Sequence, residues 1–243
     1  MKVAIAFWGI QRSLKFTYDS IKTNILNPIH EGNIEYDIYM HTYSLTSYVN
    51  KRANEKVSSI TEIDNDQYII LNCKQINIEP QDDVTKDINM LQYRTHRDPW
   101  CSNYNSVDNF ILAQYSKQKV TNLIRNSGIH YDYVIFVRPD CKYITKFDIR
   151  FLEFANDNTI VIPNFHLCGP FKFNDRFCVA NPQTFHAYGD IFTHLKDISK
   201  REPLHSETVI GRLLTSRSIK FKYVHFPFRR VRHNNVVVDT DVK

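Results

Sequence analysis

The sequence has no pattern that by itself assigns it to a zinc-binding or membrane class. Its five cysteines include no pair spaced C-x-x-C, which argues against a zinc site built from cysteine. Their odd number and wide spacing are typical of a reduced, cytoplasmic protein. The early apolar run from Val3 to Trp8 is too short for a signal peptide, and no run approaches the roughly 18 residues of a membrane-spanning helix. We therefore expect no membrane span.

A strong excess of one charge is also missing. Lys and Arg total 31 against 26 for Asp and Glu, which gives a net charge of +5. Nucleic-acid binding calls for a dense basic stripe, and the basic cluster from Arg229 to His233 is not part of a long basic run interleaved with aromatics. We expect no nucleic-acid partner, whereas a phosphorylated small molecule suits the mild positive charge.

No G-x-G-x-x-G motif, internal repeat or low-complexity linker occurs. Without a linker, residues 1–243 are expected to form a single domain. The chain is 42% hydrophobic and 23% charged, which is usual for a globular protein of this size. Aromatic residues make up 13% of the chain and supply stacking surfaces for a base or a sugar as well as core.

The most informative stretch runs from Tyr131 to Asp140. Its residues 133–137 are all aromatic or branched apolar, which predicts a strand buried on both faces, as in a parallel sheet. Pro139 has no N–H for a sheet ladder, so the strand ends there and leaves Arg138 and Asp140 at its carboxyl end. Ligands of open α/β sheets bind at that edge. An ordinary strand end with a salt-bridged Asp has the same sequence pattern.

A second polar turn follows the first predicted strand. Gly9 stands just past that strand, where a glycine allows the backbone to approach a ligand closely, and Arg12 is placed to pair with a phosphate. A plain strand-to-helix turn with a surface arginine would give the same residues.

The rest of the chain alternates predicted strands and helices. Strands are expected over 2–7, 35–41, 67–72, 74–78, 133–137, 159–163, 174–180 and 219–225. Helices are expected from about 14 to just before Pro28, over 106–126 and 146–154, and from 181 and 205 onward, with loops over 44–66 and 81–87. This alternation predicts an α/β fold with a mostly parallel central sheet flanked by helices.

Five collinear segments together resemble the capsule- and virus-type glycosyltransferases of the GT-A fold, enzymes of bacterial polysaccharide clusters and large DNA viruses. The segments are 3–12, 36–43, 131–140, 174–188 and 205–214. The resemblance implies a single GT-A-like, Rossmann-like domain with a nucleotide-binding half over about 1–142 and an acceptor-side half over about 143–243. It also implies transfer of a hexose or pentose from a nucleoside-diphosphate sugar to a hydroxyl of a glycan or glycoprotein, as in polysaccharide biosynthesis. The implied compartment is the cytoplasm, that of the host if a virus encodes the protein.

The resemblance also assigns roles to residues. Gly9 and Arg12 match the nucleotide-contacting turn, and Asp140 matches the acidic position beside the donor diphosphate, where Mn²⁺ or Mg²⁺ usually binds. Asp175 belongs to a segment that matches an acceptor-side motif. The remaining implied positions are Glu207, an acidic residue at the start of a late helix, and His225, the nearest candidate for a late metal-binding histidine.

The sequence departs from the family at the metal motif. The usual pattern is Asp-any-Asp, but Arg138 and Lys142 occupy the positions that flank Asp140. A hard divalent cation prefers several oxygen ligands. Two alternatives follow: the nucleotide's diphosphate completes a weak metal site, or cationic side chains such as Arg138 neutralise the diphosphate in place of the metal. We expect the first, with a metal that binds only weakly until the diphosphate completes its oxygen shell.

Glycosyl transfer needs charge stabilisation at the leaving diphosphate and, if configuration inverts, a base for the acceptor hydroxyl. The candidates for the first role are Arg12, Arg138, Asp140 together with a metal, or the C-terminal arginines Arg229, Arg230 and Arg232. Asp175 and Glu207 are the catalytic candidates for the second, although a turn-capping Asp and a helix-start Glu are ordinary structural features. The incomplete metal motif leaves a catalytically silent nucleotide-sugar-binding or assembly module as the alternative.

Overall fold

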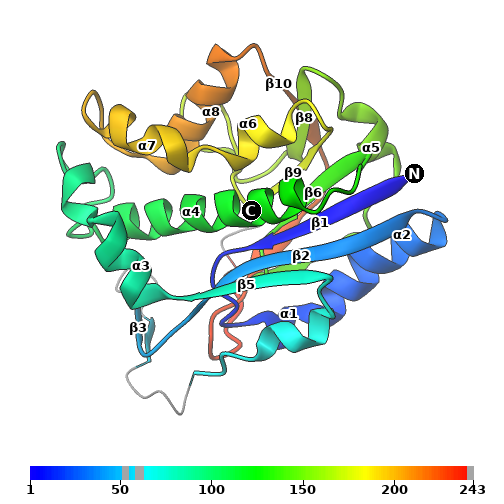
Figure 1. Cartoon of the computed structure of the whole chain (residues 1–243), viewed down its shortest axis with the longest axis horizontal. Helices are drawn as coiled ribbons and strands as arrows, with labels where there is room; N and C mark the ends of the chain where they lie inside the picture. Colours follow the sequence, from blue (N-terminus) through cyan, green and yellow to red (C-terminus); the bar gives the residue numbers. More distant parts are fainter. Residues whose placement is uncertain (51–54, 58–62, 240–243) are drawn as a thin grey trace.

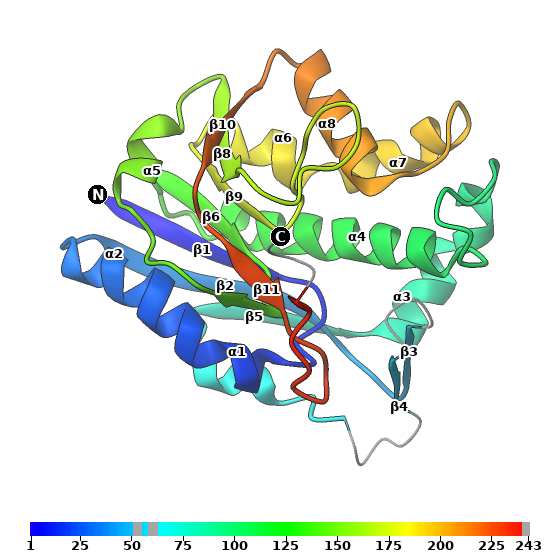
Figure 2. The same cartoon turned by 180° about the vertical axis from the view of Figure 1, so that it is seen from behind.

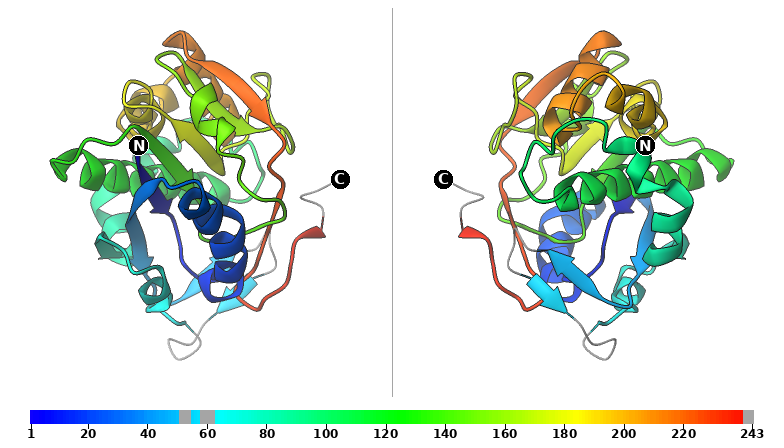
Figure 3. Two further views of the ribbon diagram at one scale, coloured as in Figure 1. Left: turned by 90° about the vertical axis from the view of Figure 1, so that its right-hand side faces the viewer. Right: turned by 90° about the vertical axis from the view of Figure 1, so that its left-hand side faces the viewer.

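The protein is built on a seven-stranded sheet between two layers of helices, as Figure 1 and Figure 3 show for the computed structural model. The structure describes residues 1–50, 55–57 and 63–239. The order of strands across the sheet is β10-β8-β9-β6-β1-β2-β5. Their bounds, in that order, are Lys220–Val224, Thr159–Pro163, Phe177–Ala180, Tyr133–Val137, Lys2–Trp8, Glu35–Ser44 and Gln75–Pro80.

The sheet is mostly parallel, as the buried apolar strands predict. β1 pairs in parallel with both β2 and β6, and β9 alone runs antiparallel to its neighbours β6 and β8. β1 and β6 are buried along almost their whole length because helices cover both faces. The predicted α/β fold class is therefore confirmed.

One face of the sheet is covered by α4, α6, α7 and α8, and the other by α1, α2 and α5 (Figure 1). The bounds of these helices in chain order are Leu14–Ile21 for α1, Asn27–Glu31 for α2, Asn105–Asn126 for α4, Arg150–Phe154 for α5, Phe185–Gly189 for α6, Phe192–Ser199 for α7 and Ser206–Ser216 for α8. Each layer forms its own apolar core against the sheet.

Two small antiparallel pairs lie outside the main sheet. The first joins β3, Tyr48–Asn50, to β4, Glu55–Val57. The second joins β7, Cys141–Tyr143, to the C-terminal strand β11, Phe228–Arg230, and Figure 2 shows this strand on the side of the sheet that carries α1. Because β7 follows β6 closely in the chain, the second pair holds the C-terminal strand β11 near the carboxyl end of β6.

Four local predictions are wrong. Residues 67–72 do not form a strand, because Gln67–Leu71 is a 3-10 helix whose Ile69 side chain is exposed. The acidic segment expected to be a loop is α3, Gln81–Ile88, which buries Val84 and Ile88 and has Asp82 and Asp83 in its first turn, where acidic residues favour a helix.

The first helical segment also does not end before Pro28. A π-helical turn, Lys22–Leu26, connects α1 to α2, and Pro28 occupies the first turn of α2, where its missing N–H costs nothing. The expected loop 44–66 contains β3 and β4, and its residues 51–54 and 58–62 lie outside the described part of the chain.

The order of the strands fixes where a ligand binds. From β1 the chain moves outward to β2 and β5, and then returns to place β6 on the other side of β1. The carboxyl ends of β1 and β6 therefore flank the point where the connection reverses direction, which is the ligand-binding crevice of open α/β sheets.

Candidate functional site

A cavity of about 750 Å³ opens at this reversal point. The volume lies within the range of pockets that bind small molecules. Six of the residues singled out in the sequence line it: Gly9, Arg12, Arg138, Asp140, Asp175 and Glu207. These segments are far apart in the chain. They meet here because β1 and β6 end, and the antiparallel β9 begins, at the same edge of the sheet.

Gly9 allows β1 to turn sharply into the cavity. Its φ is +96°, a backbone conformation that side-chain-bearing residues rarely adopt, and its N–H donates to Ser116 Oγ at 2.8 Å. The preceding Trp8 is buried and lines the cavity. The glycine at this turn is therefore required by the backbone.

Asp140 is held by Arg138 through a two-point ion pair. Arg138 Nε donates to Oδ1 at 2.8 Å and Nη2 donates to Oδ2 at 2.5 Å, while Asp140 is only 2% exposed. Burial raises the pKa of the Asp140 carboxyl, but the charges of Arg138 and Arg12 outweigh burial and hold that pKa well below its usual value. Asp140 is an ionised carboxylate at any physiological pH.

Arg12 connects three groups at the mouth of the cavity. Its Nη2 lies 3.4 Å from Asp140 Oδ2, its Nε lies 3.6 Å from Glu55 Oε1, and its Nη1 donates to the hydroxyl of Tyr48. The guanidinium carbon also lies 4.8 Å from the centre of the Tyr48 ring. These contacts fix the side chain, which is 10% exposed, at the cavity wall.

Asp175 also lines the cavity and lies just before β9. Its Oδ1 has no hydrogen-bond partner among the described residues, and the nearest cation, Arg176 Nη1, is 3.8 Å away. Burial raises the pKa of Asp175, but Arg176, Arg138 and Lys117 together bring it below its usual value. Asp175 is thus an ionised carboxylate in the cavity lining, and its Oδ1 is buried.

Glu207 is in the first turn of α8 and is 7% exposed. Ser206 Oγ donates to its Oε2, His205 Nδ1 lies 3.6 Å from the same atom, and Arg176 Nη2 lies 4.0 Å from Oε1. The His205 ring stacks on Trp100 with a centroid separation of 4.9 Å. These contacts hold Glu207 in a fixed position, and Arg176 lies between it and Asp175 as a shared partner.

Sequence reasoning missed Lys117, a buried residue of α4. The side chain is 0% exposed, and its Nζ has no hydrogen-bond partner among the described residues. The amine instead lies 3.8 Å from the centre of the Tyr188 ring and 4.7 Å from that of Trp8. Burial lowers the pKa of Lys117 to about 7. Its position among buried residues of α4, at helical spacing from Gln114 and Thr121, is the signal that could have identified it.

The C-terminal segment, whose arginines were candidates for stabilising the leaving diphosphate, does supply residues to the cavity. Arg230 lies opposite Cys141 in the β7–β11 pair, and the next N–H, from Val231, donates to the backbone carbonyl of Asp140 at 2.8 Å. Arg230 and Arg232 both line the cavity. Their basic cluster was visible in the sequence, but nothing local indicated that it packs beside Asp140.

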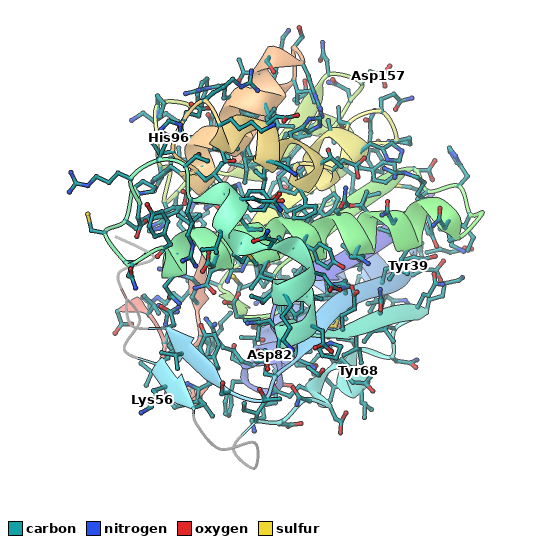
Figure 4. The ribbon with its side chains drawn as sticks, turned by 60° about the vertical axis from the view of Figure 1, so that its left-hand side comes forward. Tyr39, Lys56, Tyr68, Asp82, His96 and Asp157 are labelled. Carbon is teal, nitrogen blue, oxygen red and sulfur yellow. The ribbon has the colours of Figure 1, made fainter. Side chains whose placement is uncertain are left out.

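Glu55 is a further buried carboxylate that sequence reasoning did not single out. It is 3% exposed and accepts from Arg232 Nη1 at 3.3 Å and from the His233 backbone N–H at 3.2 Å. Its neighbour Lys56 points outward from β4, as Figure 4 shows, because side chains alternate along a strand. Glu55 links the β3–β4 pair to the C-terminal segment.

The cavity is cationic overall. Its described lining includes five arginines and three carboxylates. Two tryptophans, Trp8 and Trp100, and the rings of Tyr43, Tyr48 and Phe110 also line it. Such a site suits a ligand that combines an anionic group with a flat or apolar one.

The described side chains do not fit a divalent metal. No group of three or more His, Cys, Asp or Glu side chains with metal-binding geometry occurs within 1–50, 55–57 and 63–239. Both oxygens of Asp140 already accept from Arg138, whereas Mn²⁺ or Mg²⁺ requires several free oxygen ligands. His225 is exposed beyond the end of β10 and is not among the described residues that line the cavity. The structure therefore does not bring His225 together with Asp140.

Comparisons with solved structures give similar folds among glycosyltransferases. The apo form of the glycosyltransferase GlyE from Streptococcus pneumoniae TIGR4 is 10% identical, with a TM-score of 0.48 over 91% of this chain and 45% of that one. The galactosyltransferase LgtC with donor and acceptor sugar analogues is 10% identical, with a TM-score of 0.48 over 91% and 73%. Mouse xyloside xylosyltransferase 1 is 11% identical, with a TM-score of 0.45 over 92% and 85%.

The chain thus spans less than half the length of GlyE. The sequence matches no protein-family model and no curated protein. No helix in the described part of the chain is long and apolar enough to cross a membrane. The function is therefore argued from the cavity itself.

Proposed function

We propose that the protein is a glycosyltransferase that moves a hexose or pentose from a nucleoside-diphosphate sugar to a hydroxyl of a glycan or glycoprotein. The observation that carries the proposal is one cavity whose lining combines arginines around Asp140 with the carboxylates of Asp175 and Glu207. Cations suit a leaving diphosphate, and carboxylates suit the positive charge that develops on the sugar. The resemblance of five collinear segments to GT-A glycosyltransferases supports the same reaction.

The reaction assigns each group a task. The acceptor oxygen forms a bond to the anomeric carbon as the bond from that carbon to the diphosphate oxygen breaks, and the diphosphate leaves with the electron pair. Arg12 and Arg138 stabilise the negative charge on the leaving diphosphate, and Asp140 keeps Arg138 oriented through the two-point ion pair.

Asp175 and Glu207 have different tasks. A general base works best when its pKa is near the working pH, and the pKa of Asp175 is held below its usual value. Asp175, which lines the cavity, therefore stabilises the oxocarbenium-like sugar through its negative charge. Glu207, which is hydrogen-bonded by Ser206, takes the proton of the acceptor hydroxyl if configuration inverts.

A thermal-shift screen of nucleoside diphosphates tests binding first. A ligand present at 100 times its Kd stabilises the folded state by about 2.7 kcal/mol, which raises the Tm by roughly 5–10 °C for a chain of this size. Release of nucleoside diphosphate from a bound donor sugar in the absence of acceptor then distinguishes an enzyme from a silent binding module. Binding without release would support the silent module, which the occupied carboxylate of Asp140 favours.

A further inference from the structure

Four arginines surround the proposed diphosphate position, and we call them the guanidinium cluster: Arg12, Arg138, Arg230 and Arg232. They come from the turn after β1, the end of β6 and the C-terminal segment. All four line the same cavity. The cluster is therefore assembled only when three distant parts of the chain are folded together.

Two buried carboxylates organise the cluster. Asp140 binds Arg138 at two points and lies 3.4 Å from Arg12, and Glu55 lies 3.6 Å from Arg12 and 3.3 Å from Arg232. Asp140 and Glu55 are 2% and 3% exposed. Arg12 is shared by the two carboxylates and so connects the two halves of the cluster.

The surroundings of the cluster are positive. The described lining of the cavity carries five arginines against three carboxylates. Burial lowers the pKa of Arg232, and the nearby charges of Arg12 and Arg230 lower it further while Glu55 opposes them. The cations thus repel one another, and an anion bound between them relieves this repulsion.

The diphosphate of a nucleotide sugar carries roughly two negative charges at neutral pH, which suits a cavity lined by more arginines than carboxylates. A divalent cation has no such match, because both oxygens of Asp140 are occupied and the surrounding groups are positive. We propose, building on the proposed function, that the guanidinium cluster binds the donor diphosphate directly, without a divalent metal. Arg230 and Arg232 of the C-terminal segment are diphosphate-binding residues in this account.

The C-terminal segment is built to hold those arginines in place. Beyond β11 the chain turns back on itself, with Arg232 N–H donating to the carbonyl of Val236 at 2.9 Å and Val238 N–H donating to that of Arg230 at 2.9 Å. The segment is held at two points. The Val231 N–H donates to the Asp140 carbonyl, and Arg232 Nη1 donates to Glu55. Arg232 is therefore presented to the cavity by a folded hairpin.

Calorimetric titration of UDP, GDP, ADP and inorganic pyrophosphate into the protein tests the proposal, first with excess EDTA and then with excess Mn²⁺. We expect the Kd of the preferred nucleotide to change by less than about threefold between the two conditions. Arg232→Gln should weaken binding by roughly 10- to 100-fold, because one charge-assisted contact is lost. Arg150→Gln is the matched control, since Arg150 is exposed on α5 and paired with Asp148.

The outcomes separate the inference from the proposed function. Binding in EDTA that Arg232→Gln weakens and Arg150→Gln does not would support the guanidinium cluster. Binding that appears only with Mn²⁺ would overturn the cluster while the proposed function stands. No binding of any nucleotide in either condition would overturn both. Thermal melts of both variants check folding, and Arg230→Gln gives an independent second variant if Arg232→Gln does not fold.

Discussion

The buried amine of Lys117 gives the most quantitative prediction. The side chain is 0% exposed and is sandwiched between Tyr188 and Trp8. Burial lowers its pKa from the ordinary 10.5 to about 7. We propose replacing it by methionine, which has a similar length and no charge.

The magnitude follows from proton linkage. A lysine with a pKa of 10.5 unfolded and about 7 folded binds fewer protons in the folded state throughout that interval, so stability rises with pH between the two values. The resulting penalty on the folded state is about 4 kcal/mol at pH 7 and about 1 kcal/mol at pH 10. Lys117→Met should therefore be stabilising relative to the wild type at pH 7, and this advantage should shrink by about 3 kcal/mol by pH 10.

Urea unfolding of the wild type and Lys117→Met at pH 7, 8.5 and 10 measures this difference, because other titrating groups cancel between the two proteins. Lys196→Met is the control, because it makes the same exchange at an exposed position on α7. A difference between wild type and Lys117→Met that stays constant from pH 7 to pH 10 would refute the pKa assigned to the buried amine.

Three further predictions concern the cavity. Asp140→Asn should lower turnover at least about a hundredfold while nucleoside diphosphate still binds, because Arg138 loses its orientation but keeps its charge; unchanged turnover in steady-state assays would reject the assignment. Glu207→Gln should lower kcat while leaving the Kd of the donor within about threefold, measured by kinetics and calorimetry, and a large loss of donor affinity would instead place Glu207 at the donor. Gly9→Ala should lower the free energy of unfolding by about 1–2 kcal/mol in urea titrations because φ is +96°, and a neutral effect would show that the turn relaxes.

Continuous apolar runs made the centre of the fold predictable. Residues 133–137 are apolar because β6 is covered on both faces, and the polar residues that follow mark the edge where the cavity opens. The same reasoning placed Gly9 after β1. Six of the seven candidate site residues consequently meet in one cavity, whereas His225 does not line it.

The remaining site residues depend on long-range packing. Arg230 reaches the cavity because β11 pairs with β7, and Glu55 is buried because the C-terminal segment folds over it. Neither contact has a local sequence signal. The amphipathic pattern of α3 is carried by only two buried residues, Val84 and Ile88, and was hidden by its acidic first turn.

The most direct test of the central claim is release of nucleoside diphosphate from a panel of nucleotide sugars, without acceptor, by the wild type and by Asp175→Asn. Because Asp175 places an ionised carboxylate in the cavity lining, we predict measurable release from at least one donor by the wild type and a loss of at least about a hundredfold in the variant. Absence of release from every donor, or equal rates for the two proteins, would contradict the account.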